Sequence, residues 1–158
     1  MPDLVQGSAP PEEIARDWEQ FTGGPPVVGV LRRYQPEDVE SLALRDGEGR
    51  MAGLVTWWVQ GDRAEIVSLH AATPGQGTGT ALMDAAEAAL RRRGVRQAVL
   101  VTSNDNLAAL RFYVRRGYRL VRVHLDAMDA VRALKPAVPL TGRDGAPLRD
   151  LWELWKDL

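Results

Sequence analysis

The sequence contains no cysteine, only two histidines and no run of 18 apolar residues. The absence of cysteine excludes disulfide bonds, thiolate nucleophiles and cysteine-based zinc sites. His70 and His124 lie far apart in the chain, and neither has a second ligand at helical spacing. We therefore interpret both as structural histidines and expect no metal ion. Without a long apolar run, no membrane-spanning helix is predicted.

An excess of charge of one sign is also lacking, because 20 Lys and Arg residues stand against 21 Asp and Glu residues. A net charge of -1 gives no global attraction to nucleic acid or anionic lipid, so neither is expected as a partner. Residues 1–11 contain no basic segment followed by an apolar one, so we expect no signal peptide and a cytoplasmic protein. The 158 residues, 45% of them hydrophobic, predict one globular domain over 1–158.

The spacing of apolar residues predicts a short helix and then several strands in the first half of the chain. The helix is expected over 11–20, because Ile14 and Trp18 lie four residues apart. Residues 1–26 are interpreted as a poorly defined helix and linker, followed by a core over 27–125. Alternation of apolar residues predicts strands over 27–33, 40–45, 50–60 and 64–72.

The hydrophobic period changes from two to 3.6 after Pro74, where Leu82, Ala86 and Leu90 form the apolar stripe of a helix ending at Gly94. A strand, a helix and a strand in this order predict a right-handed parallel crossover and a mixed α/β fold. The elements expected after this helix are a strand over 97–102, a helix over 106–116, a strand over 118–125 and a helix over 127–134.

The carboxyl-terminal segment, residues 148–158, is ambiguous. Its apolar residues have the spacing of an amphipathic helix, and strict alternation fails over 150–157, so periodicity alone favours a helix. Trp152 and Trp155 are expected to pack on the protein's own sheet, with docking on a partner or on lipid as the alternative.

The most informative segment is TPGQGTGTALM, residues 73–83, which lies between a predicted strand and a predicted helix. Gly75, Gly77 and Gly79 let backbone amides approach a ligand, and together with the free donors of the helix start they suit a pyrophosphate. The spacing matches neither GxGxxG nor the P-loop, so a pyrophosphate-bearing cofactor of another kind is indicated. A flexible turn without a ligand is the alternative.

This segment resembles the acetyl-coenzyme A motif of the GNAT superfamily of N-acetyltransferases, Gln/Arg-x-x-Gly-x-Gly/Ala. With Gly77 and Gly79 as the motif glycines, Pro74 takes the place of the leading Arg or Gln. Gln76, Gly79 and Ala81 satisfy the pattern in a second register. The first register is preferred because it keeps Gly75 in the loop.

A second block, NLAALRFYVRRGY at residues 106–118, resembles the family's NxxAxxFYxxxGF segment. It matches at Asn106, Ala109, Phe112, Tyr113 and Gly117. The phrases TSNDN (102–106) and KPAVPLTGRDGAPLRD (135–150) are similar to a bacterial subgroup whose chain ends in a strand. On this resemblance we predict a strand rather than a helix at 148–158.

The resemblance implies the GNAT fold, which is a central mixed, largely antiparallel sheet with a parallel strand–helix–strand unit and flanking helices. It implies binding of acetyl-coenzyme A beside strand 64–71 and direct acetyl transfer to a primary amine of a small molecule or peptide. A non-catalytic acyl-coenzyme A binding or sensor domain is the alternative, and a homodimer is compatible with either. The cofactor contacts implied are Leu69, Ala71, Gly75, Gln76, Gly77, Thr78, Gly79, Thr80, Asn106 and Tyr113.

Three of the polar residues have two interpretations each. Asn106 caps the following helix, contacts the pantetheine arm of the cofactor, or does both. Tyr113 either donates a hydrogen bond to the thioester sulfur or makes an ordinary hydrogen bond in the core. An amine with an ordinary pKa near 10.4 must lose a proton before it attacks, and Glu65, on a strand face with Val67 and Leu69, is the candidate base. A structural carboxylate is the alternative for Glu65.

Overall fold

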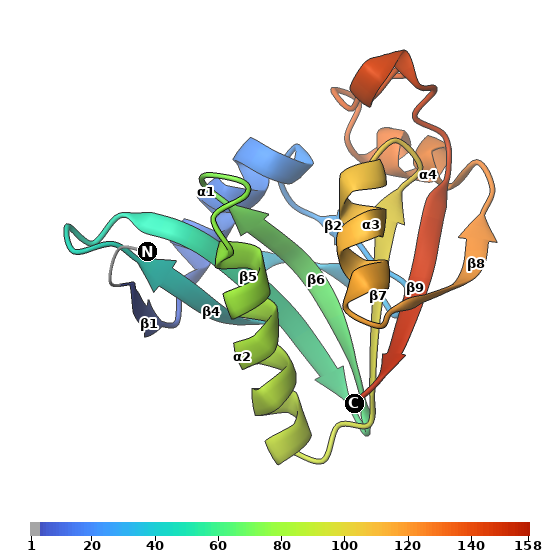
Figure 1. The fold of residues 1–158 in the computed structure, drawn as a ribbon. Coiled ribbons are helices and arrows are strands. Elements are labelled where there is room, and N and C mark those ends of the chain that lie inside the picture. Colours follow the sequence, from blue (N-terminus) through green and yellow to red (C-terminus); the bar gives the residue numbers. More distant parts are fainter. Residues whose placement is uncertain (1–3) are drawn as a thin grey trace.

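The computed structural model describes residues 4–158, and a mixed seven-stranded sheet lies at its centre (Figure 1). The strand order is β1-β4-β5-β6-β7-β9-β8, and of these neighbouring strands only β6 and β7 are parallel. The predicted mixed α/β fold with one parallel crossover is therefore confirmed. The strands are β1 (Val5–Gly7), β4 (Glu40–Arg45), β5 (Met51–Gln60), β6 (Arg63–Ala71), β7 (Gln97–Ser103), β8 (Arg119–His124) and β9 (Leu151–Asp157).

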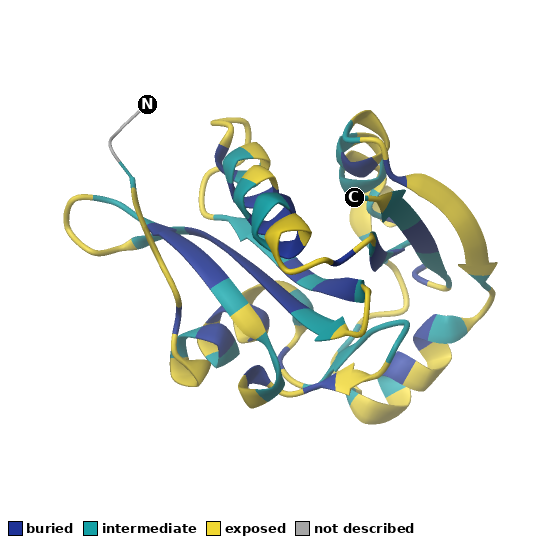
Figure 2. Cartoon of the chain, turned by 90° about the horizontal axis from the view of Figure 1, so that it is seen from below, coloured by how far each residue is buried: buried dark blue, intermediate teal, exposed yellow. Residues whose placement is uncertain are grey.

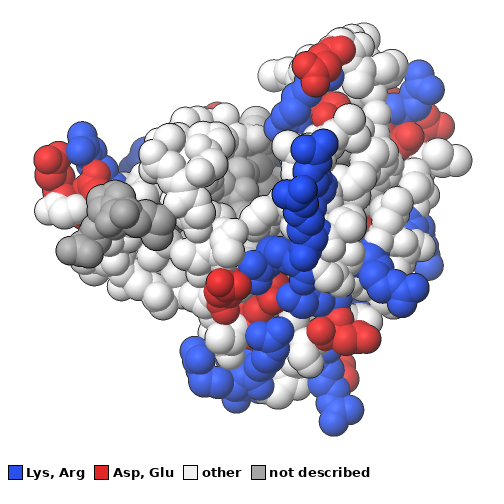
Figure 3. All heavy atoms as spheres, in the orientation of Figure 1, with Lys and Arg blue, Asp and Glu red and all other residues white. Residues whose placement is uncertain are grey.

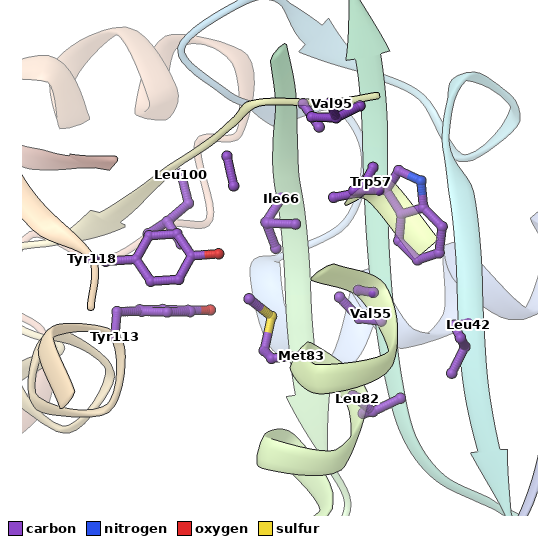
Figure 4. Packing of buried hydrophobic residues seen from close by; sticks show 14 of the residues in the cluster. Leu42, Val55, Trp57, Ile66, Leu82, Met83, Val95, Leu100, Tyr113 and Tyr118 are labelled. Carbon is purple, nitrogen blue, oxygen red and sulfur yellow. The ribbon is translucent and has the colours of Figure 1, made fainter. Parts of the chain in front are cut away.

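Helices cover both faces of this sheet. Figure 2 shows α2 with its buried stripe turned toward the sheet and its outer face exposed. Leu82 and Leu90 of this stripe are fully buried in a core with Val55 and Trp57 of β5, part of which is drawn in Figure 4. On the other face, Trp18 of α1 belongs to a second core. The helices are α1 (Pro11–Thr22), α2 (Thr78–Arg92), α3 (Leu107–Arg115) and α4 (Ala127–Leu134), with 3₁₀ turns η1 (Pro36–Asp38) and η2 (Arg143–Gly145).

The single strand predicted over 27–33 is wrong. The chain forms two short strands instead, β2 (Val27–Val28) and β3 (Arg33–Tyr34), which pair with each other as a separate hairpin. The physical cause lies in the turn, because Gly29 passes so close to the Glu65 carboxylate that a Cβ atom there would lie 2.5 Å from either oxygen. Amides in this turn are bonded to that carboxylate rather than to a neighbouring strand.

The predicted alternation along β6 is also wrong, because the strand contains a β-bulge. Trp57 is opposite Ile66 and Thr56 is opposite Ser68, so Val67 is the extra residue. As a result, Leu69 packs on the α2 side with the first core, whereas Val67 packs on the α1 side. Glu65 also faces the α1 side, where it contacts the hairpin.

The carboxyl-terminal segment is a strand, which confirms the prediction from the resemblance and overturns the one from periodicity. β9 lies between β7 and β8 and pairs antiparallel with both. Both faces of β9 are covered, one by the first core and the other by the cluster around α4, so apolar residues need not alternate along it. Leu154 is fully buried in the first core, while Leu151 packs with the cluster around α4.

Candidate functional site

The site is built around a divergence of β6 and β7. The two strands pair only from Arg63 to Glu65 and from Gln97 to Val99, and they then separate (Figure 1). A groove of about 710 Å³ lies along the diverging halves, lined by residues 66–70 of β6 and 100–103 of β7. The fold therefore opens a cavity between its two parallel strands, at the carboxyl ends where ligands commonly bind in α/β folds.

The glycine-rich loop lies between β6 and α2, as predicted. Gly75 and Gly77 have φ angles of 81° and 80°, and Gly77 is the N-cap residue of α2. The first helical hydrogen bond joins the Ala81 amide to the Gly77 carbonyl, so the amides of residues 78–80 precede the helical ladder. The first turn of α2 carries no acidic residue. This helix start is suited to an anion.

A cationic groove of about 680 Å³ lies between α2 and α3. Thr80 lines it next to the glycine-rich loop, and Figure 3 shows Lys and Arg side chains forming a band over α3. The cationic residues of this groove are Arg111, Arg115, Arg116 and Lys156. Asp84 also lines the groove and pairs with Arg116, and Lys156 pairs with Glu87. Arg111 and Arg115 therefore extend the anion-binding character of the loop along α3.

The residues of the second sequence block lie on the groove wall. Asn106 is the N-cap of α3, its Oδ1 atom accepts a hydrogen bond from the Ala109 amide at 3.2 Å, and the residue lines the groove. Tyr113 also lines the groove and is 8% exposed. Its ring packs edge-on against Tyr118 (Figure 4) and, on another side, against Phe112. Burial raises the pKa of Tyr113, although nearby Arg116 opposes this, so the hydroxyl keeps its proton and can donate it in a hydrogen bond.

The remaining predicted cofactor residues differ in whether they line a groove, and in which groove they line. Leu69 lines the groove between β6 and β7, and Thr80 lines the cationic groove. Ala71 ends β6 beside the loop, outside the set of residues that line either groove. The residues of the loop and the helix start that connect the two grooves along the chain are Gly75, Gln76, Gly77, Thr78 and Gly79.

Glu65 is buried below the hairpin, with 1% of its surface exposed, and it is not among the residues lining the grooves. Its carboxylate accepts hydrogen bonds from the amides of Val30 (2.6 Å) and Leu31 (3.0 Å) and from the Tyr34 hydroxyl (2.6 Å). Burial raises the pKa of Glu65, and these three hydrogen bonds oppose the rise. The contacts support a structural carboxylate, and the catalytic role of Glu65 stays a prediction.

Sequence reasoning missed the α1 side of the groove, where His70 of β6 meets α1. His70 Nδ1 lies 2.6 Å from Asp17 Oδ2, and its ring stacks on Phe21 with centroids 4.4 Å apart. Lys135, after α4, lines the same part of the groove and donates to the carbonyls of Thr22 and Gly24. No local pattern connects residues 17 and 70, which meet only through the packing of α1 on the sheet.

A loop from 139 to 148 borders the far end of the groove. Asp105 holds this loop by accepting hydrogen bonds from the Arg143 amide at 3.0 Å and guanidinium at 3.1 Å. Burial alone would raise the pKa of Asp105, but hydrogen bonds from Ser103 and Arg143 and the charge of Arg143 hold it below its usual value. The carboxylate is therefore ionised at neutral pH and fastens the loop to the end of β7.

Two further findings concern only residues 4–158. No helix there combines the length and apolar character needed to cross a bilayer. No three side chains of the metal-ligating types gather there in one place.

Comparison with known proteins agrees with this geometry. A family model described as the acetyltransferase (GNAT) family matches residues 9–118. The YxbD protein of Bacillus subtilis is 34% identical over 149 residues, which cover 94% of each chain. An IAA acetyltransferase from Bacillus cereus has the same fold, with a TM-score of 0.77, 18% identity and coverage of 99% of this chain and 100% of that one. A GNAT acetyltransferase from Elizabethkingia anophelis, crystallised with acetyl-CoA, gives a TM-score of 0.74 at 13% identity over the full length of both chains. The chain therefore belongs to the GNAT family of acetyltransferases.

Proposed function

We propose that this protein transfers the acetyl group of acetyl-coenzyme A directly to a primary amine. The observation that carries the proposal is the junction of β6 and α2, where the glycine-rich loop connects two cavity-lining residues: His70 of the groove between β6 and β7, and Thr80 of the cationic groove. The Elizabethkingia neighbour binds acetyl-CoA in the same fold, which supports the choice of acyl donor.

The loop and its surroundings fit the chemical parts of this donor. Amides of residues 78–80 would bind the pyrophosphate, and Arg111 and Arg115 would neutralise the remaining phosphate. The pantetheine arm would lie in the groove, along Leu69 and Asn106. Backbone groups of β6 beyond its last pair with β7 face the groove and suit the amides of that arm.

Tyr113 would act on the leaving group. Tyr113 lines the groove and its buried hydroxyl stays protonated, so it would donate a hydrogen bond to the thioester sulfur. A phenol of ordinary pKa near 10 is a weaker acid than a thiol near 8.5, so the hydrogen bond, rather than full proton transfer, would stabilise the departing thiolate.

The amine would approach from the α1 side, where Phe21, His70 and Lys135 line the groove. Its proton must leave before attack, which costs about 4 to 5 kcal/mol at pH 7 for an amine of ordinary pKa. A base that accepts this proton would therefore accelerate the reaction near neutral pH.

The test is a screen of primary amines with acetyl-coenzyme A, read by the thiol released, and calorimetry with acetyl-coenzyme A, NAD and ATP. The panel contains spermidine, tyramine and short peptides with a free α-amino group. We expect acetyl-coenzyme A to bind far better than NAD or ATP and at least one amine to be acetylated. Equal affinity for ATP would exclude the proposed donor. Tight binding without acetylation of any amine would instead favour an acyl-coenzyme A sensor.

A further inference from the structure

His70 is held in one orientation by two residues of α1. Its Nδ1 atom lies 2.6 Å from the Asp17 carboxylate, which is itself buried, and Phe21 stacks on the imidazole ring with an interplanar angle of 18°. The His70 side chain is 17% exposed. An imidazole that is oriented by a carboxylate and still open to a cavity has the arrangement needed to exchange a proton with a bound molecule.

The position of His70 connects two cavities. The groove between β6 and β7 reaches it from one side, and a second cavity of about 470 Å³, between α1 and the β4–β5 hairpin, reaches it from the other. His70 and Phe21 line both cavities. A molecule in the second cavity would therefore meet one in the groove at the His70 ring.

We propose that His70 is the general base for the acceptor amine and that Asp17 is its positioning residue, an inference that rests on the proposed acetyl transfer. Asp17 accepts a hydrogen bond from the Nδ1–H group and so leaves the lone pair of His70 on Nε2. A hydrogen bond of this kind fixes the tautomer and stabilises the imidazolium that forms when Nε2 takes a proton.

With His70 as base and Tyr113 beside the leaving sulfur, both protons that the ammonium group loses are accounted for. The ammonium group passes one proton to His70 Nε2, which releases it to water. The amine lone pair then attacks the thioester carbonyl carbon, the C–N bond forms and the C–S bond breaks. The second proton that the nitrogen loses ends on the coenzyme A sulfur, which Tyr113 hydrogen-bonds as it leaves. Two protons leave the ammonium nitrogen, one to water and one to the thiol.

His70 fits this role better than Glu65 does. Glu65 lies below the hairpin, and three donors already occupy its two oxygens. A proton could reach it only if one of these hydrogen bonds were given up, whereas Nε2 of His70 has no such cost. Both side chains face the α1 side of β6, but His70 lines the groove and the second cavity, whereas Glu65 lines neither.

The charged groups around His70 come from several elements packed around it. Among the described residues, the charged group that contacts the ring is Asp17, whose Oδ2 atom lies 2.6 Å from Nδ1. Glu13 and Arg45, which line the second cavity, pair with each other at 2.6 Å, so their charges largely cancel. Three more cations line the cavities: Arg16 of α1, Lys135 after α4, and Arg143, which pairs with Asp105 at 3.1 Å.

The kinetic test compares His70→Asn and Asp17→Asn with the wild type, using the best acceptor of the amine panel. Asn at 70 can keep a hydrogen bond to Asp17 but has no basic nitrogen. We expect kcat/KM at pH 7.5 to fall about 10² to 10⁴-fold in His70→Asn and to recover toward wild type as pH approaches the pKa of the amine. Asp17→Asn should also lower kcat, because an amide that donates to Nδ1 moves the proton to Nε2. The double variant should be no slower than His70→Asn, because the two residues act as one unit.

His124→Asn is the matched control, since His124 also contacts a carboxylate, Glu153 at 2.7 Å, but lies outside the groove. Its turnover should equal that of the wild type. A pH profile of His70→Asn that runs parallel to the wild-type profile, or additive losses in the double variant, would overturn the proposal.

A second measurement separates failure of this inference from failure of the proposed function. If the wild type acetylates no amine, acetyl transfer fails, but the orientation of His70 is still decided by the ¹⁵N chemical shifts of its imidazole at pH 8. The chain has two histidines, so the His124→Asn variant assigns both signals. A proton on Nδ1 and a lone pair on Nε2 supports the proposal, and a proton on Nε2 refutes it.

Discussion

The Tyr34 hydroxyl donates a hydrogen bond to Glu65 Oε1 at 2.6 Å and thereby fastens the β2–β3 hairpin to the central sheet. The amides of Val30 and Leu31 complete the contact. A single carboxylate thus holds the turn and the following strand of the hairpin. Val27 and Val28 of the same hairpin line the groove. By holding the hairpin, Glu65 therefore fixes the position of part of the groove wall without lining the groove itself.

Replacing Glu65 with Gln should lower stability, because three donors would then face one carbonyl oxygen and an amide group. We expect a loss of about 1 to 3 kcal/mol in the free energy of unfolding, measured by urea denaturation at pH 7. The shape of the kcat/KM profile against pH should stay that of the wild type. Recovery of a slow Glu65→Gln enzyme at high pH would instead identify Glu65 as the base.

The stability difference between wild type and Glu65→Gln should also depend on pH. Burial raises the pKa of Glu65 in the folded protein. A carboxyl with a raised pKa favours the folded state fully below its unfolded pKa of about 4.3, and this contribution is lost as pH rises through the folded pKa. The advantage of Glu over Gln should therefore shrink above that pKa. Urea titrations of both proteins at several pH values would test this, and a widening difference would contradict it.

Gly77→Glu should weaken the binding of acetyl-coenzyme A by at least about tenfold, because it places a negative charge and a side chain at the start of α2. Gly94→Glu is the control, since Gly94 has a φ angle of 81° against 80° for Gly77 but follows the other end of α2. The two variants therefore place a Glu residue at nearly the same positive φ angle, so their backbone strain is similar. Calorimetry should show a loss in the first variant alone, and equal losses would point to a general effect of strain.

Tyr113→Phe should keep the affinity for acetyl-coenzyme A but reduce kcat about ten- to a thousand-fold, because a hydrogen bond to the leaving sulfur is lost. The raised pKa of Tyr113 means that wild-type activity should show no decline from tyrosine ionisation near pH 10. Tyr118→Phe is the control, since its hydroxyl donates to Glu87 at 3.1 Å in the core. That variant should lose stability rather than turnover. Unchanged turnover in Tyr113→Phe would return Tyr113 to a packing role.

Asp105→Asn should loosen the loop at 139–148 and speed tryptic cleavage after Arg143. The lowered pKa of Asp105 means that its stabilising contribution is present above its unfolded pKa of about 3.9 and is lost as pH falls through the folded value. Wild-type protein should therefore approach the variant in stability under acid conditions. Asp144→Asn, at an exposed position of the same loop, should cleave at the wild-type rate. Equal rates for all three proteins would show that Asp105 does not hold the loop.

Local patterns predicted most of the fold, because a helix or strand with one buried face carries its period in the sequence. The stripe of Leu82, Ala86 and Leu90 predicted α2, and the glycines before it predicted the anion-binding loop. Three features depended on tertiary contacts and were not visible. These are the bulge at Val67, the hairpin turn at Gly29 and the apolar residues on both faces of β9.

The candidate site divides between residues that a sequence motif can indicate and residues that it cannot. Asn106 and Tyr113 lie on one continuous segment whose resemblance to a family motif indicated them, and both line the groove. The pair of Asp17 and His70 belongs to no such motif, because it forms only when α1 packs across the end of β6. The same holds for any residue on the α1 side of the groove, because its contact with β6 cannot be predicted from spacing in the sequence.

The order of strands has a consequence for synthesis on the ribosome. β9 follows β7 and β8 in the chain but lies between them, pairing with seven residues of β7 from Gln97 to Ser103. A nascent chain that has emerged only as far as β8 therefore has two strands whose facing edges have no partner yet. Unpaired edges are the templates on which separate chains join. Chains stalled before residue 151 should accordingly associate with one another or with chaperones. This tendency should end once β9 has been synthesised and pairs with both β7 and β8.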